Sequence, residues 1–117
     1  MLRKAIAIVL ASLSLTSAYA GGLKQGRITG VLIATSIPDK AFIRIDGSYS
    51  ANQPEPSCSA GVSEWDFALD LTTLTGRALY SMVVAAQASQ VTVTAEGFGT
   101  CTLRSNYEDL NYIHSDT

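Results

Sequence analysis

Histidine, cysteine and basic side chains are scarce in this sequence, and each scarcity excludes a class of function. The 117 residues include one histidine, two cysteines and eight lysines and arginines, against ten acidic residues. A structural zinc site takes four ligands, more than the cysteines and the histidine supply together. The chain also lacks the basic excess that neutralises the phosphates of nucleic acid or of anionic lipid. We therefore expect no metal site, no cofactor and no nucleic-acid partner.

Long apolar runs are missing as well, and the one marked run lies at the N-terminus. Two basic residues precede an apolar stretch over residues 5–15, and residues 18–20 (AYA) include the small side chains that a signal peptidase accepts. The stretch is too short for a membrane span, which needs about 20 apolar residues. The pattern instead predicts a secretory signal peptide over residues 1–20, cleaved after Ala20. The mature protein is then expected to be acidic and either secreted or periplasmic.

The predicted mature chain, residues 21–117, has the length of a single domain. Both cysteines, Cys58 and Cys101, lie in this part, and an even number of cysteines in a small exported chain indicates a disulfide. By chain entropy, a bond that closes a loop of this length stabilises the fold by about 4 kcal/mol. The alternatives are two free thiols or half of a metal site, and the single histidine argues against the second.

Apolar and polar residues alternate with a period of two along much of the chain, which predicts β-strands. The clearest run spans residues 64–71, where Trp65, Phe67, Leu69 and Leu71 share one face and the other face is mostly acidic. Such one-sided strands are typical of antiparallel sheets. Further strands are expected over residues 27–34, 41–46, 90–96 and 100–103.

After Leu71 the apolar residues take the spacing of three and four that is typical of an amphipathic helix. We expect this helix over residues 73–88, with Thr72 or Thr73 as its N-terminal cap. Gly76 weakens the first turn by up to ~1 kcal/mol relative to alanine, and we interpret it as a point of close approach to the sheet. The other segments are expected to be a loose leader, a long polar loop and a short closing segment, over residues 21–26, 48–61 and 107–114.

The predicted order of elements is strand, strand, strand, helix, strand, strand. A short chain with one-sided strands closes most economically into a barrel whose open end is covered by the helix. This is the layout of the OB-fold, a five-stranded, partly open Greek-key barrel. We therefore predict a β-rich (α+β) OB-like barrel with one helix and one disulfide, as a single domain over residues 21–117. The main alternative is an open α+β sheet with the helix across one face.

Catalytic residue patterns are incomplete, so we do not expect an enzyme. Residues 61–65 (GVSEW) begin like the G-x-S-x-G elbow of serine hydrolases but lack the final glycine. His114 lies three residues from the end of the chain, where a general base is poorly held. Glu64 and Asp66 share a strand face and could form the carboxylate pair of a glycosidase. We favour a solvated acidic face, because nothing in the sequence predicts the burial that would separate the two pKa values, and a small hydrolase is only the third hypothesis.

Aromatic residues are the best indication of a binding surface. Tyr49 lies in the long polar loop, and Tyr107 and Tyr112 lie near the end of the chain. Tyrosine offers a large contact area at a low cost in conformational entropy, which suits both sugars and protein partners. These three tyrosines are the predicted ligand-binding residues.

Three short motifs resemble the binding subunits of subtilase cytotoxin and typhoid toxin. They are Trp65-x-Phe67, residues 78–80 (ALY) on the predicted helix and residues 90–93 (QVTV) in the strand after it. The resemblance covers about residues 65–95, and small exported bacterial proteins of unassigned function show a similar pattern. The resemblance implies an exported, disulfide-bonded OB-fold with the same order of elements. It also implies a pentameric ring that binds sialylated glycans and delivers a separate enzymatic subunit.

The chain departs from these toxin subunits in ways that bear on ligand binding. It is shorter, and residues 97–99 (GFG), which we interpret as a turn, replace the aromatic-rich segment that follows their fourth strand. None of their sugar-contacting residues can be matched to a position here. The leading hypothesis is an exported, non-enzymatic module that binds a glycan or a protein, as a homo-pentamer with the helix lining a central pore. The alternative is a monomeric periplasmic module that binds or inhibits one protein.

Overall fold

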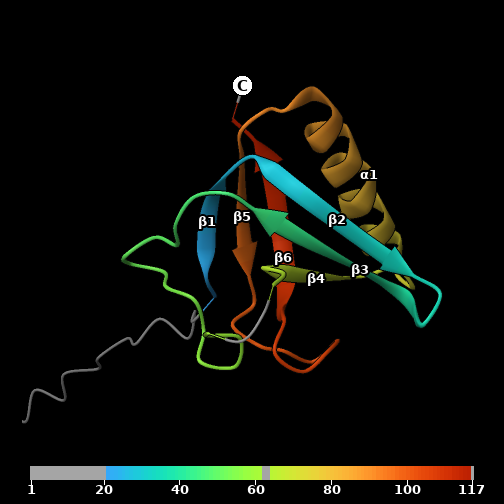
Figure 1. Cartoon of the computed structure of the whole chain (residues 1–117), viewed down its shortest axis with the longest axis horizontal. Helices are drawn as coiled ribbons and strands as arrows, with labels where there is room; N and C mark the ends of the chain where they lie inside the picture. Colours follow the sequence, from blue (N-terminus) through green and yellow to red (C-terminus); the bar gives the residue numbers. More distant parts are fainter. Residues whose placement is uncertain (1–20, 62–63, 117) are drawn as a thin grey trace, which may run out of the picture.

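The computed structural model describes residues 21–61 and 64–116 of the chain. The predicted signal peptide over residues 1–20 and Ser63 of the incomplete hydrolase motif lie outside these ranges. The described residues form six strands and one helix (Figure 1). The elements in chain order are β1 (Leu23–Gly26), β2 (Ile28–Ala34), β3 (Ile37–Ile45), β4 (Phe67–Asp70), α1 (Leu74–Ser89), β5 (Val93–Gly97) and β6 (Glu108–Ser115).

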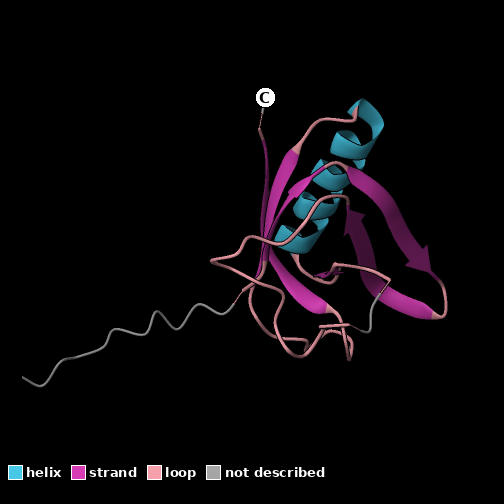
Figure 2. Ribbon diagram, turned by 60° about the vertical axis from the view of Figure 1, so that its left-hand side comes forward, coloured by secondary structure: helices cyan, strands magenta, loops and turns pink. Residues whose placement is uncertain are grey.

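The six strands form one curled sheet in the order β1-β5-β6-β4-β3-β2. Neighbouring strands are antiparallel except β4 and β6, which are parallel. The two edge strands, β1 and β2, are consecutive in the chain and only Arg27 separates them. The sheet therefore curls round until its two edges meet in one continuous segment, as Figures 1 and 2 show. This is the predicted OB-like barrel, with the first strand divided into two.

The division of the first strand at Arg27 has a local cause in Asp46, at the end of β3. The Asp46 carboxylate accepts a hydrogen bond from the Arg27 N–H at 2.6 Å, and the Asp46 N–H donates to the Arg27 carbonyl at 2.9 Å. A side chain at Gly26 would overlap the Asp46 carbonyl, so glycine permits this close approach. The chain bends here and passes from pairing with β5 to pairing with β3.

Two of the sequence predictions for the ends of the domain are wrong. Residues 21–26 are not a loose leader, since Gly21 and Gly22 are buried and β1 follows them. Residues 100–103 do not form the last strand; the last strand is β6, within the predicted closing segment. The threonines that suggested a strand instead donate hydrogen bonds to Asp109, as described below, and so shape a loop.

The helix lies close to its predicted position and packs against β2, β4 and β6. Thr73 is the N-terminal cap, and its hydroxyl accepts a hydrogen bond from the Gly76 N–H at 2.9 Å. Gly76 is buried, and a Cβ atom there would overlap the carbonyl oxygen of Asp70 at the end of β4. The interpretation of Gly76 as a point of close approach is therefore confirmed.

The core lies between the concave face of the sheet and the helix, which contributes Val83 and Ala86. The strand at residues 67–70 is shorter than predicted, and it is buried on both faces rather than one. Ala68 pairs with Phe42 on the outer face, where the ring of Tyr107 lies 5.1 Å from that of Phe42. The outer face is buried here because the segment after β5 folds back over it. Other core residues are Ile28, Ala41, Ile43, Ile45, Phe67, Leu69, Val93, Ala95, Leu110 and Ile113.

The predicted disulfide is confirmed between Cys58 and Cys101, with the two Cα atoms 6.1 Å apart. It joins the long loop after β3 to the loop between β5 and β6. These two loops lie together at the bottom of the molecule in the views of Figures 1 and 2. The disulfide therefore holds these two loops, which have little regular secondary structure, against each other.

Candidate ligand-binding cleft

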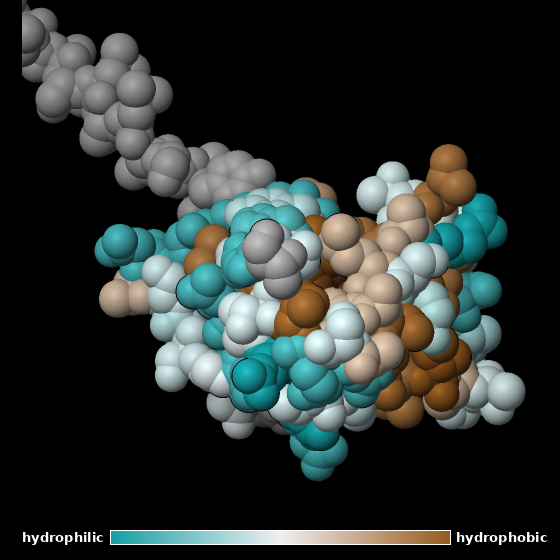
Figure 3. Space-filling model, turned by 90° about the horizontal axis from the view of Figure 1, so that it is seen from above, coloured by the Kyte–Doolittle hydropathy of each residue, from teal (hydrophilic) through white to brown (hydrophobic). Residues whose placement is uncertain are grey.

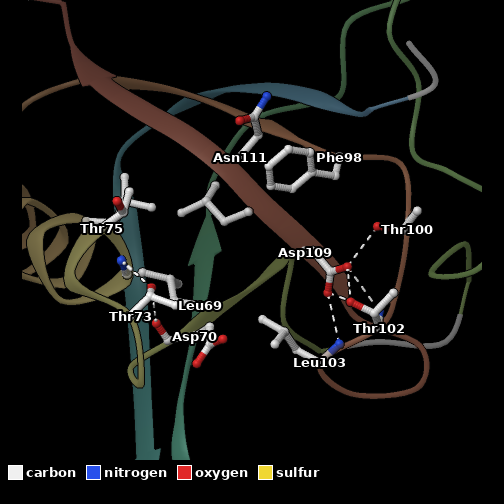
Figure 4. Close-up of a pocket in the computed structure, with 13 residues that line it drawn as sticks. Leu69, Asp70, Thr73, Thr75, Phe98, Thr100, Thr102, Leu103, Asp109 and Asn111 are labelled. Carbon is white, nitrogen blue, oxygen red and sulfur yellow. Dashed lines mark hydrogen bonds between the residues drawn. The ribbon is translucent and has the colours of Figure 1, made fainter. Parts of the chain in front are cut away.

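A cleft of about 450 Å³ lies where the first turn of α1 meets the loop after β5 (Figure 4). Its lining comes from the end of β4, the start of α1, residues 98–103 and the start of β6. The close packing of Gly76 on Asp70 brings the first two of these together. The disulfide at Cys101 and the hydrogen bonds of Asp109 hold the third in place.

The apolar part of the cleft comprises a floor and an exposed aromatic ring. Leu69, Leu79 and Leu110 supply aliphatic side chains from β4, α1 and β6. Phe98 also lines the cleft, and 53% of its surface is exposed, which is unusual for a phenylalanine in a small domain. An exposed aromatic ring beside an aliphatic floor is a surface that gains free energy when a ligand covers it.

Polar groups from separate elements converge on the same cleft. Figure 4 shows Thr73, Thr75 and Asp70 toward one end, and Asn111 beside Phe98 toward the other. The Asp70 carboxylate accepts hydrogen bonds from the hydroxyl and the N–H of Thr72, which lower its pKa and keep it ionised. A carboxylate has about four lone-pair sites, so Asp70 can accept further hydrogen bonds from a ligand.

Asp109 holds the loop that carries the aromatic side of the cleft. Its carboxylate accepts hydrogen bonds from the hydroxyls of Thr100 and Thr102 and from the N–H groups of Thr102 and Leu103, at 2.6–3.0 Å. Burial alone would raise the pKa of Asp109, but these hydrogen bonds outweigh it and the pKa lies below its usual value. The Asp109 carbonyl also accepts from the Phe98 N–H at 2.9 Å. One aspartate therefore positions both the loop and the exposed ring.

The three predicted ligand-binding tyrosines lie outside this cleft, and each contacts another side chain. The ring of Tyr49 lies 6.4 Å from that of Phe67, with the Lys24 ammonium 5.1 Å above it. Tyr107 packs on the ring of Phe42 on the outer face of the sheet. Tyr112 stacks on His114 with ring centroids 6.0 Å apart. All three are half-buried, and each packs against a different aromatic side chain in a different part of the domain.

The other candidate residues from the sequence also lie away from the cleft. Asp66 accepts hydrogen bonds from Lys24 at 2.9 Å and from the Ile45 N–H at 2.7 Å, which gives it a role in joining strands. Glu64 is exposed and does not line the cleft. His114 is exposed and lies 3.1 Å from the Asp116 carboxylate. Within residues 21–61 and 64–116 no group of three or more cysteine, histidine or acidic side chains is placed to hold a metal ion.

None of the residues that line the cleft was among the predicted binding residues, and Phe98 is the one for which the sequence held a signal. The flanking glycines, Gly97 and Gly99, led us to interpret the segment as a turn with no further role. The available signal was a large apolar side chain at the tip of a turn, where polar residues are usual.

The outer face of α1 is a second surface of note, and it is apolar. Leu74 is 79% exposed, Met82 and Val84 are each 41% exposed, and Arg77 is the single charged residue of the helix. Met82, Ala85 and Val91 line a shallow hollow of about 360 Å³ beside β6. Figure 3 shows apolar surface gathered on the side of the molecule where Figure 1 places α1.

Comparison with known protein families, curated proteins and solved structures finds no match to this chain. The resemblance to toxin binding subunits therefore depends on the short motifs alone. In the part of the chain that the structure describes, no helix has the length and apolar character needed to cross a membrane.

Proposed function

We propose that this protein is an exported, non-enzymatic binding module whose cleft takes one sugar residue of a glycan. The observation that carries the proposal is the exposed ring of Phe98 in a cleft that is also lined by Asp70, Asn111 and four threonines. A sugar presents an apolar C–H face, which suits an aromatic ring, and hydroxyl groups that both donate and accept hydrogen bonds. A largely apolar cleft with a few convergent polar groups is the usual form of a small-molecule site.

The charge of the cleft favours a neutral sugar. None of the described residues that line it is lysine or arginine, and Asp70 and Asp109 both have lowered pKa values. A carboxylate-bearing sugar such as sialic acid would be repelled at this position. In this respect the cleft differs from what the resemblance to toxin subunits implies.

A glycan array probed with the oxidised chain that begins at Gly21 tests this proposal. We expect the protein to bind a set of neutral oligosaccharides on the array. The affinity for these oligosaccharides is then measured by calorimetry. Phe98→Ala and Asn111→Ala should each weaken binding at least about tenfold, the loss expected for one well-placed contact. Ile33→Ala, an exposed apolar residue of β2 outside the cleft, is the matched control and should bind as the parent does. Failure to bind any glycan, or equal affinity for Phe98→Ala and the parent, contradicts the proposal.

We also propose that the protein assembles into a ring through the apolar outer face of α1. This face has a single charge and several exposed apolar side chains, which a soluble monomer would leave in contact with water. The competing proposal is a monomeric periplasmic module that covers the same face with one partner protein. Light scattering at micromolar concentration separates the two, because a ring gives a multiple of the monomer mass and a monomer contradicts ring formation.

A further inference from the structure

Glu108, the first residue of β6, is an acidic side chain that is 0% exposed. Its Oε2 atom accepts hydrogen bonds from the N–H groups of Gly22 and Gly99, both at 2.9 Å. Its Oε1 atom is buried and has no hydrogen-bond partner among the described residues. Buried carboxylates are normally paired with a positive charge. The Glu108 carboxylate therefore lacks a positively charged partner among the described residues.

The charged and titratable groups around Glu108 do not supply that partner. Glu55 and Asp109 are acidic, and the ring of Tyr49 lies against the same place, with a buried hydroxyl that makes no hydrogen bond among the described residues. Lys24 on β1 is engaged with Asp66 at 2.9 Å. Burial raises the pKa of Glu108 to about 7; the two amide hydrogen bonds oppose this rise, and Glu55 and Asp109 add to it.

Glycines from the two ends of the domain surround the Glu108 carboxylate. A Cβ atom at Gly22 would lie 2.8 Å from Oε1, and one at Gly97 would overlap the carboxyl group itself. A Cβ atom at Gly21 would overlap the Gly97 carbonyl. Gly21 and Gly22 are therefore packed into the interior beside the carboxylate, and larger residues would not fit there.

The backbone nitrogen of Gly21 lies close to Glu108. Consecutive backbone nitrogens are at most about 3.7 Å apart, since three bonds join them. Because the Gly22 nitrogen is 2.9 Å from Oε2, the Gly21 nitrogen lies within roughly 6.6 Å of it. In the uncleaved chain this nitrogen belongs to an uncharged amide.

Signal-peptide removal changes the charge of that nitrogen. A signal peptidase adds water across the Ala20–Gly21 peptide bond, so that Ala20 leaves with a carboxylate and Gly21 gains a free amine. An α-amine with the usual pKa of about 7.7–8.0 takes up a proton at neutral pH. The mature chain would then carry an ammonium group about one residue from the buried carboxylate.

We propose that cleavage after Ala20 creates the counter-ion of Glu108, and that the Gly21 ammonium pairs with its carboxylate inside the barrel. The fold thereby gains stability when the signal peptide is removed, and the two glycines that precede β1 are held in place. This inference depends on the cleavage position and is independent of the glycan proposal.

A double-mutant cycle tests the pairing. One chain begins at Gly21 and a second retains Ala20, which moves the ammonium by one residue and leaves an amide at Gly21. Each is made with Glu108 and with Glu108→Gln, and unfolding in urea is measured at pH 7. We expect the extra residue to lower the folding equilibrium constant at least about tenfold with Glu108 and by less than about twofold with Glu108→Gln, because contacting charges are coupled. Equal losses in both backgrounds would overturn the proposal.

A second measurement does not require the Glu108→Gln variant to fold. In the chain that retains Ala20, the folded state holds a proton on Glu108 between about pH 4.5, near the usual pKa of the unfolded chain, and about 7. Its stability therefore falls as pH rises through this window. In the chain that begins at Gly21, the ammonium lowers the pKa of Glu108 and the fall should be smaller. Identical pH profiles, or an exported protein whose mass shows a different first residue, would refute the pairing.

Discussion

At the scale of single residues, one glycine decides whether the helix can pack on the sheet. Helix propensity alone predicts that Gly76→Ala stabilises the chain, by up to ~1 kcal/mol. The structure predicts the opposite, because a Cβ atom would overlap the Asp70 carbonyl and force α1 away from β4. We expect a net loss of about 2 kcal/mol in the free energy of unfolding, within the range for overpacking. Thr75→Ala, at an exposed position in the same turn, is the control and should change stability by less than about 0.5 kcal/mol.

A second residue-scale prediction concerns acid. The pKa of Asp109 is lowered in the folded state, so its carboxylate contributes stability that is present above the unfolded pKa of about 3.9. That contribution is lost as pH falls below this value toward the folded pKa. Asp109→Asn should therefore reduce stability at pH 7 and flatten its decline in acid.

Urea unfolding measured from pH 2.5 to 7 checks this, with Asp39→Asn at an exposed position of β3 as a charge-matched control. If stability falls equally steeply in acid for Asp109→Asn and for the parent, the hydrogen bonds to the Asp109 carboxylate do not act as described.

At the scale of elements, strong periodicity predicted some segments well. The helix carries apolar residues at regular spacings, and each of its ends was predicted to within one residue. The strand predicted over residues 64–71 contains β4, which is shorter because it begins at Phe67. The β1 strand could not be predicted, because two buried glycines before it resemble a flexible leader. Residues 100–103 were misassigned because Thr100 and Thr102 suit a strand as well as they suit hydrogen bonds to a distant aspartate.

The cleft was not predictable from the sequence, because it depends on contacts between residues far apart in the chain. It forms from four segments, and the contact that unites them depends on Asp109 and on the close approach at Gly76. The sequence indicated a close approach to the sheet at Gly76 but not that a cleft forms beside it, and the hydrogen bonds to Asp109 leave no local pattern. Phe98 in particular acquires its meaning only from the neighbours that the fold gives it.

The disulfide gives an element-scale prediction. Replacing Cys58 and Cys101 with serine should lower the free energy of unfolding by about 3–4 kcal/mol, the chain-entropy estimate for a loop of this length. The loss should fall mainly on the two joined loops, so the amide protons of residues 98–107 should exchange faster than those of β3. If the amide protons of all strands instead exchanged faster by the same factor, the disulfide would not act mainly on the two loops that it joins.

At the scale of the whole molecule, the apolar helix face predicts the assembly state. Met82→Glu places a charge on the exposed centre of that face. If copies of the chain meet through α1, the variant should sediment as a monomer while the parent forms a ring, since a buried unpaired charge is costly. Ile33→Glu, an equally apolar exposed site on β2, is the control for charge alone. A parent and a Met82→Glu variant of equal mass would contradict assembly through this face.

The barrel and the disulfide fix the loop after β5, which lines the proposed cleft. The most direct test is a two-dimensional amide NMR titration of the oxidised chain that begins at Gly21 with a neutral oligosaccharide selected on the array. We predict that the shifted resonances cluster at Asp70, Thr75, Phe98 and Asn111. Shifts confined to Tyr49, Tyr107 and Tyr112, or to the outer face of α1, would place the ligand elsewhere and contradict the proposed site.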